Sequence, residues 1–254
     1  MSIAVERDSG VVRLTLDRPE RRNALTVDGF AELGRVLAEI ARTPDDRAVL
    51  ITGAGGAFCA GADLSAGVPD ESVVRVMDRI NDAARALHRL PQPTVAAVGG
   101  PAVGAGMSLA LGCDLVVASP AATFCQIFVK RGLSPDFGSS WLLPRLVGLQ
   151  TAKRLALLGD TITAEQARDL GLVSAVMAPD DLLDTATALA RRLADGPPIA
   201  LALTKRLLDA SFTSTFDEAL DAEAAASAVN TATEDVAEAF AAFAAKRPAV
   251  FRGR

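Results

Sequence analysis

The 254-residue chain has no tyrosine, one tryptophan and one histidine, so several classes of function have little to build on. Aromatic residues make up 4% of the chain, which argues against the stacking platforms that bind single-stranded nucleic acid. Positive charge is also scarce, because 26 Lys and Arg residues stand against 31 Asp and Glu residues. The formal net charge of −5 carries no long run of one sign, and we expect no nucleic-acid partner.

Cysteine is nearly absent. Cys59, Cys113 and Cys125 are an odd number, without a CxxC pair or a neighbouring histidine, which favours a reducing compartment over disulfides or a zinc site. The N-terminal residues lack a basic segment followed by an apolar one, and no run of about 18 apolar residues is present. We therefore expect a cytoplasmic protein with no membrane span and no metal.

The usual nucleophile and nucleotide motifs are missing as well. There is no Walker sequence and no GxSxG, and the lone His88 ends an amphipathic segment, where we expect it at the surface. The stretch from Gly104 to Leu109 lacks the last glycine of a dinucleotide fingerprint, so a nicotinamide dehydrogenase is a weak alternative.

What the chain does have is strands alternating with helices, which predicts an α/β fold with a mainly parallel sheet. Strands are expected at 11–16, 48–52, 94–98 and 115–118. Thr26 is placed to cap a helix. The apolar stripe of that helix is Phe30, Leu33, Leu37 and Ile40, and that of a second helix, over 70–90, is Val73, Met77, Ile80, Ala84 and Leu87.

Strand signals vanish after Pro179. Helices are expected near 180–195, 198–210, 214–230 and 232–246, with a break at Asp195-Gly196-Pro197-Pro198. We predict an α/β core over residues 1–195 and a helical region over 196–254. The last helix carries a stripe of Val236, Phe240 and Phe243, which either packs on its own core or joins subunits.

Two turns rich in Gly and Ala follow buried strands: GGAFCAGADL (55–64) and GGPAVGAG (99–106). Such turns leave backbone N–H groups unobstructed, as the binding of a developing oxyanion requires. The alternative is that tight crossings between strand and helix simply need small residues.

Together these turns resemble a known family. GGAFCAGADL looks like the first fingerprint of the crotonase (enoyl-CoA hydratase/isomerase) superfamily. The similarity continues, in the family's order and spacing, through LDRPERRNAL (16–25), PTVAAVGGPAVGAGMSLALGCDLVVAS (93–119), LLGDTITAEQARDLGLV (157–173) and AFAAKRPAVFRGR (242–254). The resemblance implies a crotonase-like core of repeated ββα units, an all-helical C-terminal region, and a homotrimer or dimer of trimers.

The resemblance also implies an acyl-CoA thioester as substrate, with coenzyme A as part of it and no separate cofactor. The thioester oxygen would accept hydrogen bonds from the amides of Ala62 and Ala105. Asp63 is either a ligand contact or a helix N-cap. The implied substrate-binding residues are Arg22, Ala24, Ala60, Asp63, Leu64, Ser108 and Phe128, with Phe243 and Lys246 near the coenzyme in the tail.

The chemistry depends on which acids are present. Ser108 and Phe128 stand where hydratases of this family carry two glutamates, and neither can perform their acid–base work. Asp136, in RGLSPDFGSSWLLPRL, resembles the acid of enoyl-CoA isomerases and of the phenylacetate-pathway epoxy-CoA isomerase branch. We predict a double-bond shift by Asp136, whose pKa burial would raise. Hydration, a non-catalytic acyl-CoA binding protein, and Asp136 as a mere helix cap are the alternatives.

Overall fold

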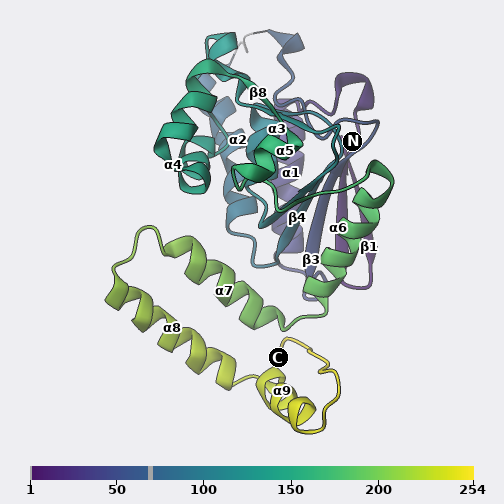
Figure 1. The fold of residues 1–254 in the computed structure, drawn as a ribbon, viewed down its shortest axis with the longest axis vertical. Helices are drawn as coiled ribbons and strands as arrows, with labels where there is room; N and C mark the ends of the chain where they lie inside the picture. Colours follow the sequence, from purple (N-terminus) through teal and green to yellow (C-terminus); the bar gives the residue numbers. More distant parts are fainter. Residues whose placement is uncertain (1, 68–70) are drawn as a thin grey trace.

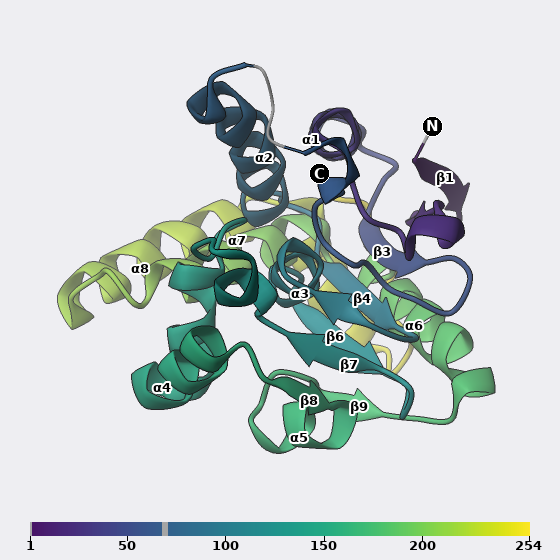
Figure 2. The same cartoon turned by 90° about the horizontal axis from the view of Figure 1, so that it is seen from above.

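The computed structural model describes residues 2–67 and 71–254 (Figures 1 and 2). Its main sheet has six strands. Their order is β1-β2-β3-β4-β6-β9; β1 pairs with β2 antiparallel, and every other pair is parallel. Each predicted strand is present. The strands are β1 (Ile3–Asp8), β2 (Val11–Leu16), β3 (Ala48–Gly53), β4 (Thr94–Val98), β6 (Leu115–Ala118) and β9 (Ala175–Val176).

A smaller sheet lies beside the main one and combines short strands that hydrophobic alternation could not reveal. It has the order β5-β7-β8, with β5 parallel to β7 and β7 antiparallel to β8. Its strands are β5 (Ala102–Val103), β7 (Thr123–Cys125) and β8 (Thr161–Thr163). Because β5 arises inside the second small-residue turn, this sheet fixes where that turn points.

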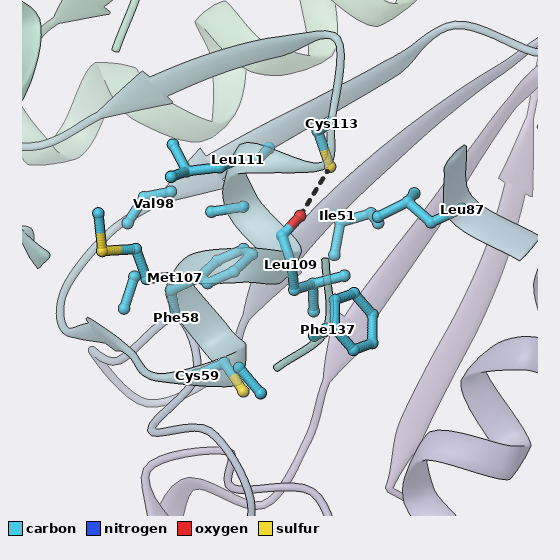
Figure 3. Close-up of a cluster of buried hydrophobic side chains, with 14 of the residues drawn as sticks. Ile51, Phe58, Cys59, Leu87, Val98, Met107, Leu109, Leu111, Cys113 and Phe137 are labelled. Atoms are coloured by element: carbon cyan, nitrogen blue, oxygen red, sulfur yellow. Dashed lines mark hydrogen bonds between the residues drawn. The ribbon is translucent and has the colours of Figure 1, made fainter. Parts of the chain in front are cut away.

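Three helices bury one face of the main sheet: α1 (Val27–Ile40), α2 (Val73–His88) and α3 (Ala105–Leu111). Thr26 caps α1 as predicted, because its hydroxyl accepts the Gly29 amide at 3.1 Å. Figure 3 shows the cluster of buried apolar side chains that includes this face. All four residues of the predicted α1 stripe are buried: Phe30, Leu33, Leu37 and Ile40.

The second predicted stripe is partly wrong. Helix α2 begins at Val73, whose side chain is 58% exposed, and Asp70, at the start of the predicted helix, lies outside the described residues. The face that packs on α1 is turned slightly from the predicted one, since Val76 and Ala83 are buried together with Ile80 and Leu87.

Helix α4 (Ser139–Leu158) follows α3 and is broken in its middle. It contains Pro144, and Gly148 takes non-helical torsion angles of φ 73° and ψ 158°. Its first turn carries Trp141, the one tryptophan, with the Arg145 guanidinium 3.9 Å above the ring centroid. The imidazole of His88 meets the same indole edge-on at 5.2 Å. His88 is exposed, as predicted.

The remaining α-helices are α5 (Ala164–Asp169), α6 (Pro179–Ala194), α7 (Pro198–Ala210), α8 (Phe216–Thr231) and α9 (Glu234–Ala244). Helix α6 covers the second face of the main sheet with Leu182, Ala186 and Ala190. Helices α7 to α9 extend from the core as an arm, in which α7 and α8 pack side by side (Figure 1). The predicted boundary at residue 195 falls between α6 and α7.

Few polar contacts tie the arm to the core. The Arg47 guanidinium donates to the carbonyls of Gly196 at 2.7 Å and Phe251 at 2.9 Å. Lys205 of α7 forms an ion pair of 2.8 Å with Asp114, which also accepts the amide and hydroxyl of Thr94. Within the described ranges, every helix is too short or too polar to cross a lipid bilayer.

Candidate active site

The two small-residue turns lie against each other at the ends of neighbouring strands β3 and β4. The Cys59 amide donates to the Pro101 carbonyl at 3.1 Å, and the Val103 amide donates back to the Cys59 carbonyl at 2.9 Å. Gly106 packs so close to Cys59 that a Cβ at Gly106 would overlap the carbonyl of Cys59. Backbone contacts therefore bring together the two turns, which lie about 40 residues apart in the sequence.

Gly61 makes the approach possible at the centre of the site. It has φ of 91°, in the region that favours glycine. A Cβ added there would lie 2.7 Å from the Val103 carbonyl oxygen and 3.4 Å from the Ala105 amide nitrogen. The backbone before Ala62 and the start of α3 thus touch, with no room for a side chain between them.

The amides of Ala62 and Ala105 are the available donors at this contact. Neighbouring groups are already engaged: the Asp63 amide donates to the Leu25 carbonyl at 2.8 Å, and the Gly104 amide to the Cys125 carbonyl at 2.8 Å. Over residues 2–67 and 71–254, the amides of Ala62 and Ala105 donate to no backbone or side-chain acceptor. Both residues line one cavity of about 400 Å³.

Asn23 fixes the segment that supports the first turn. Its side chain is buried, accepts the Arg18 amide at 2.9 Å, and donates to the carbonyls of Ala54 and Ala57 at 2.8 Å each. Its φ of 59° is left-handed, a conformation that asparagine tolerates better than most residues. These three bonds hold residues 18–24 against the turn that follows β3.

Asp63 does what the N-cap alternative predicts. Its carboxylate accepts the Ser65 amide at 3.1 Å at the start of the short 3₁₀ helix Leu64–Ala66, and pairs with Arg18 at 3.0 Å. Hydrogen bonds from Ser65, reinforced by Arg18, lower the pKa of Asp63 to about 2. Asp63 also lines the cavity, so it offers a fixed, fully ionised group there and no basic proton acceptor near neutral pH.

Asp136 lines the same cavity, but the surroundings of its carboxyl group differ from those of the Asp63 carboxyl group. Its Oδ1 atom is buried and has no hydrogen-bond partner among the described residues, and desolvation raises the pKa of the carboxyl to about 6. The helix-cap alternative is wrong for this side chain. Helix α4 has Gly138 as N-cap without a side-chain cap, and only the backbone carbonyl of Asp136 accepts a helix amide, from Ser139 at 3.0 Å.

Most predicted site residues come together in this cavity, which also contains residues that the sequence did not single out. Arg21 and Arg131 bring two guanidinium groups to it, and Ile127 and Leu133 bring apolar walls. Neither arginine was predicted to bind substrate, because each ends a short 3₁₀ helix, Pro19–Arg21 or Ile127–Arg131, whose direction depends on the tertiary fold. The predicted residues that line the cavity are Ala24, Ala60, Ala62, Asp63, Leu64, Ala105, Phe128 and Asp136.

Four predicted substrate-binding residues do not line it. Ser108 is fully buried in α3, where its hydroxyl donates to the Gly104 carbonyl at 3.1 Å. The Arg22 side chain is exposed, while its carbonyl accepts the Ala60 amide at 2.9 Å, so its contribution is to the backbone of the turn. Phe243 is 86% exposed on α9, and Lys246 follows on the same arm (Figure 1).

Cysteine chemistry has no support in this site. The Cys59 thiol is buried within the first turn and donates to the Asn23 carbonyl at 3.2 Å, and burial raises its pKa to about 12. A thiol in that state is not a nucleophile at neutral pH. In the part of the chain that the structure describes, no cluster of three or more His, Cys, Asp or Glu residues could hold a metal ion.

Comparison with known proteins agrees with this geometry. A family model for enoyl-CoA hydratase/isomerase matches residues 6–254. The 1,2-epoxyphenylacetyl-CoA isomerase of Escherichia coli K12 is 41% identical over 253 residues, 97% of each chain. The short-chain-enoyl-CoA hydratase of Clostridium acetobutylicum is 35% identical over 97% of this chain and 95% of its own. A crystal structure of enoyl-CoA hydratase from Bacillus anthracis matches with a TM-score of 0.96 at 32% identity, covering 100% of both chains. The predicted resemblance and fold class are confirmed, and the chain belongs to the enoyl-CoA hydratase/isomerase family, the crotonase superfamily.

Proposed function

We propose that this protein is an acyl-CoA isomerase that shifts a double bond of an enoyl-CoA with Asp136 as the acid and base. One observation carries the proposal: among the described residues, neither the Asp136 carboxyl group nor the two backbone amides that share its cavity have a hydrogen-bond partner. A thioester enolate needs both a base beside the acyl carbons and donors for the oxygen that becomes negative.

The reaction uses one acid for two proton transfers. The Asp136 carboxylate removes a proton from the carbon next to the thioester carbonyl, and the electron pair of that C–H bond moves towards the carbonyl oxygen. The amides of Ala62 and Ala105 hold the resulting oxyanion. Protonated Asp136 then returns the proton two carbons further along while the electrons flow back from the oxygen, so the double bond moves and no atom is gained or lost.

The pKa of Asp136 suits both steps. A carboxyl group with a pKa of about 6 is mostly ionised at neutral pH, yet it holds a proton better than one with the ordinary value of 3.8. Each of the two amides contributes about 3 kcal/mol to the stabilisation of the transition state, as judged by the loss of one oxyanion donor in other enzymes. The guanidinium groups of Arg21 and Arg131 suit the phosphates of coenzyme A.

Isomerisation is favoured over hydration by the residues at the other acid positions. Ser108 uses its hydroxyl within α3, and Phe128 presents a phenyl ring to the cavity. Neither can activate a water molecule, whereas the double-bond shift requires only Asp136. The name of the E. coli relative, an isomerase of an acyl-CoA, points to the same class of reaction, while the name of the C. acetobutylicum relative keeps hydration as the second candidate.

The experiment replaces Asp136 with Asn and follows two readouts with a 3-enoyl-CoA and with crotonyl-CoA: the ultraviolet absorbance of the conjugated 2-enoyl thioester, which reports the double-bond shift, and the product mass, which reports addition of water. We expect the wild type to isomerise without a change in mass, and D136N to bind acyl-CoA with unchanged affinity while losing at least 10³-fold in kcat. The exposed carboxylate variant Asp160→Asn is the matched control and keeps full activity. Unchanged turnover in D136N would rule out the proposal.

Other outcomes separate the alternatives. A product heavier by one water identifies a hydratase. Acyl-CoA binding without product, and without exchange of solvent deuterium into the acyl group, identifies a non-catalytic binding protein.

We also propose that the chain assembles as a trimer or a dimer of trimers through the arm. Helix α9 leaves Phe240 73% exposed and Phe243 86% exposed, and α8 begins with Phe216 at 78%. Of the predicted stripe of α9, Val236 is half-buried, whereas Phe240 and Phe243 do not pack on the chain's own core. Large exposed apolar side chains, such as the two rings of α9, are typical of subunit interfaces.

A further inference from the structure

The residue after Asp136 has an unusual backbone. Phe137 has φ of 50° and is followed by Gly138 with φ of 79°, so two successive residues take left-handed torsion angles. Glycine adopts this conformation freely, but a bulky residue does so at a cost in free energy. Such a conformation persists only where surrounding structure imposes it, and strained residues of this kind gather at functional sites.

The surrounding structure that imposes it is the apolar core. The Phe137 side chain is 2% exposed and meets the Phe30 ring of α1 at 5.7 Å between centroids, inclined by 42°. Figure 3 shows Phe137 with Leu109 of α3 and Ile51 of β3 in one buried cluster. Burial of the phenyl ring therefore offsets the unfavourable backbone, and the ring acts as an anchor for this turn.

The anchor matters because little else holds the carboxyl group of Asp136. Its Oδ1 atom has no partner among the described residues, and the backbone bond from Ser139 fixes only the carbonyl. Asp136 lines the cavity of the two turns, whereas Phe137 and Gly138 line a separate cavity of about 370 Å³ between α2 and α4. Successive residues of this turn therefore line two different cavities, Asp136 the first and Phe137 the second.

We propose that Phe137 is a positioning residue. Its buried ring and left-handed backbone direct the Asp136 carboxyl group into the cavity that the two turns line, and they shield this carboxyl group from water. This inference rests on the proposed function, because it assigns Phe137 a task in the proton transfers of Asp136. In the turn 136–138, Asp136 transfers the protons, and burial of the Phe137 ring offsets the unfavourable left-handed backbone next to it.

The test measures kcat, KM and the pH dependence of kcat/KM for double-bond migration in Phe137→Gly and Phe137→Leu. Glycine removes both the anchor and the strain, so we expect kcat to fall at least tenfold while KM for the enoyl-CoA changes less than threefold. Loss of the ring also admits water to Asp136. The midpoint of the rise in kcat/KM with pH should then move from about 6 towards the ordinary 3.8. At pH 5 the variant would retain most of its own maximal rate, whereas the wild type retains about a tenth.

Phe137→Leu keeps an apolar anchor and should show the same changes to a smaller extent, which maintains the test if the glycine variant fails to fold. The matched control is Phe30→Leu, which weakens the same ring contact from α1 without altering the residue next to Asp136. A purely structural role predicts equal losses of thermal stability and unshifted pH profiles in both leucine variants, and that result would overturn the inference. If D136N itself remains active, the proposed function fails first, so the two failures are distinguishable.

Discussion

At the scale of single residues, burial of the Asp136 carboxylate lowers the stability of the folded chain at neutral pH. A carboxyl group whose pKa in the folded chain is about 6, against an ordinary 3.8, binds more protons in the native state than in the unfolded state between about pH 4 and 6. The free energy of unfolding therefore falls as pH rises through this window. Asp63 is the opposite case, because Ser65 and Arg18 lower its pKa to about 2.

The sign of this effect gives a stability prediction for Asp136→Asn. At pH 7 the variant should unfold with a free energy higher by about 1–3 kcal/mol, because an uncharged amide avoids the desolvation of the carboxylate. At pH 4 the difference should disappear, since the native carboxyl group is protonated there. Denaturant titrations of both proteins at the two pH values provide the measurement. A variant less stable at pH 7 would show that the carboxylate makes stabilising bonds.

At the scale of elements, the site depends on the contact between the turns after β3 and β4. The two turns exchange hydrogen bonds through Cys59, and Gly106 presses its backbone against the same residue. The position of the Ala105 amide is therefore set by the first turn as much as by α3 itself. Small residues serve packing and chemistry together here, so the two interpretations of these turns are not exclusive.

We expect Gly106→Ala to separate the turns, because its Cβ would overlap the Cys59 carbonyl and neither backbone can yield cheaply. Activity should fall by at least 100-fold, the effect of losing about 3 kcal/mol of oxyanion stabilisation. Gly56→Ala is the matched control within the first turn. A Cβ at Gly56 meets nothing within 4 Å, so only its φ of 81° is unfavourable, at about 1 kcal/mol of stability. Equal activity in the two variants would contradict the importance of the contact.

The elements that the sequence predicted well are those whose signal is local. The stripe of α1, the cap at Thr26 and the strands 94–98 and 115–118 follow from periodicity and side-chain chemistry. The predicted apolar stripe of α2, which began at Val73, was partly wrong because packing against α1 determines which face of this helix is buried. Short strands such as β5 exist only through their partners.

The residues of the candidate site likewise divide into those with a signal in the sequence and those that only the tertiary fold brings to the cavity. Motif resemblance predicted the two turns and Asp136, since these carry their identity in sequence. Arg21 and Arg131 remained undetected because their place in the cavity is a product of folding. Phe243, predicted as a substrate contact, is exposed on α9 and does not line the cavity.

At the scale of the whole molecule, the main sheet and the arm differ in how far the chain itself covers their apolar surfaces. Both faces of the main sheet are covered within the chain, one by α1 to α3 and the other by α6. The arm is joined to the core through few polar contacts, among them those of Arg47 and Lys205. Its apolar rings at Phe240 and Phe243 are left without cover.

We therefore expect Phe240→Ser combined with Phe243→Ser to shift the protein from three or six chains towards monomers in sedimentation velocity experiments. Removing two exposed phenyl rings from an interface costs several kcal/mol of association free energy, whereas it leaves the monomer's own core intact. Leu183→Ser on α6, at 40% exposure, is the control and should leave the distribution unchanged. A wild-type chain that sediments as a monomer would contradict this assembly.

The surroundings of Trp141 have a practical consequence for solution work. With one tryptophan and no tyrosine, the near-ultraviolet emission of this chain comes from a single indole. That indole lies five residues after Asp136 and carries a guanidinium on its face and an imidazole at its edge. Any displacement of the first turn of α4 should change the intensity and the wavelength of this emission. The molecule thus contains its own spectroscopic reporter at the edge of the loop that carries Asp136, and this reporter needs no label.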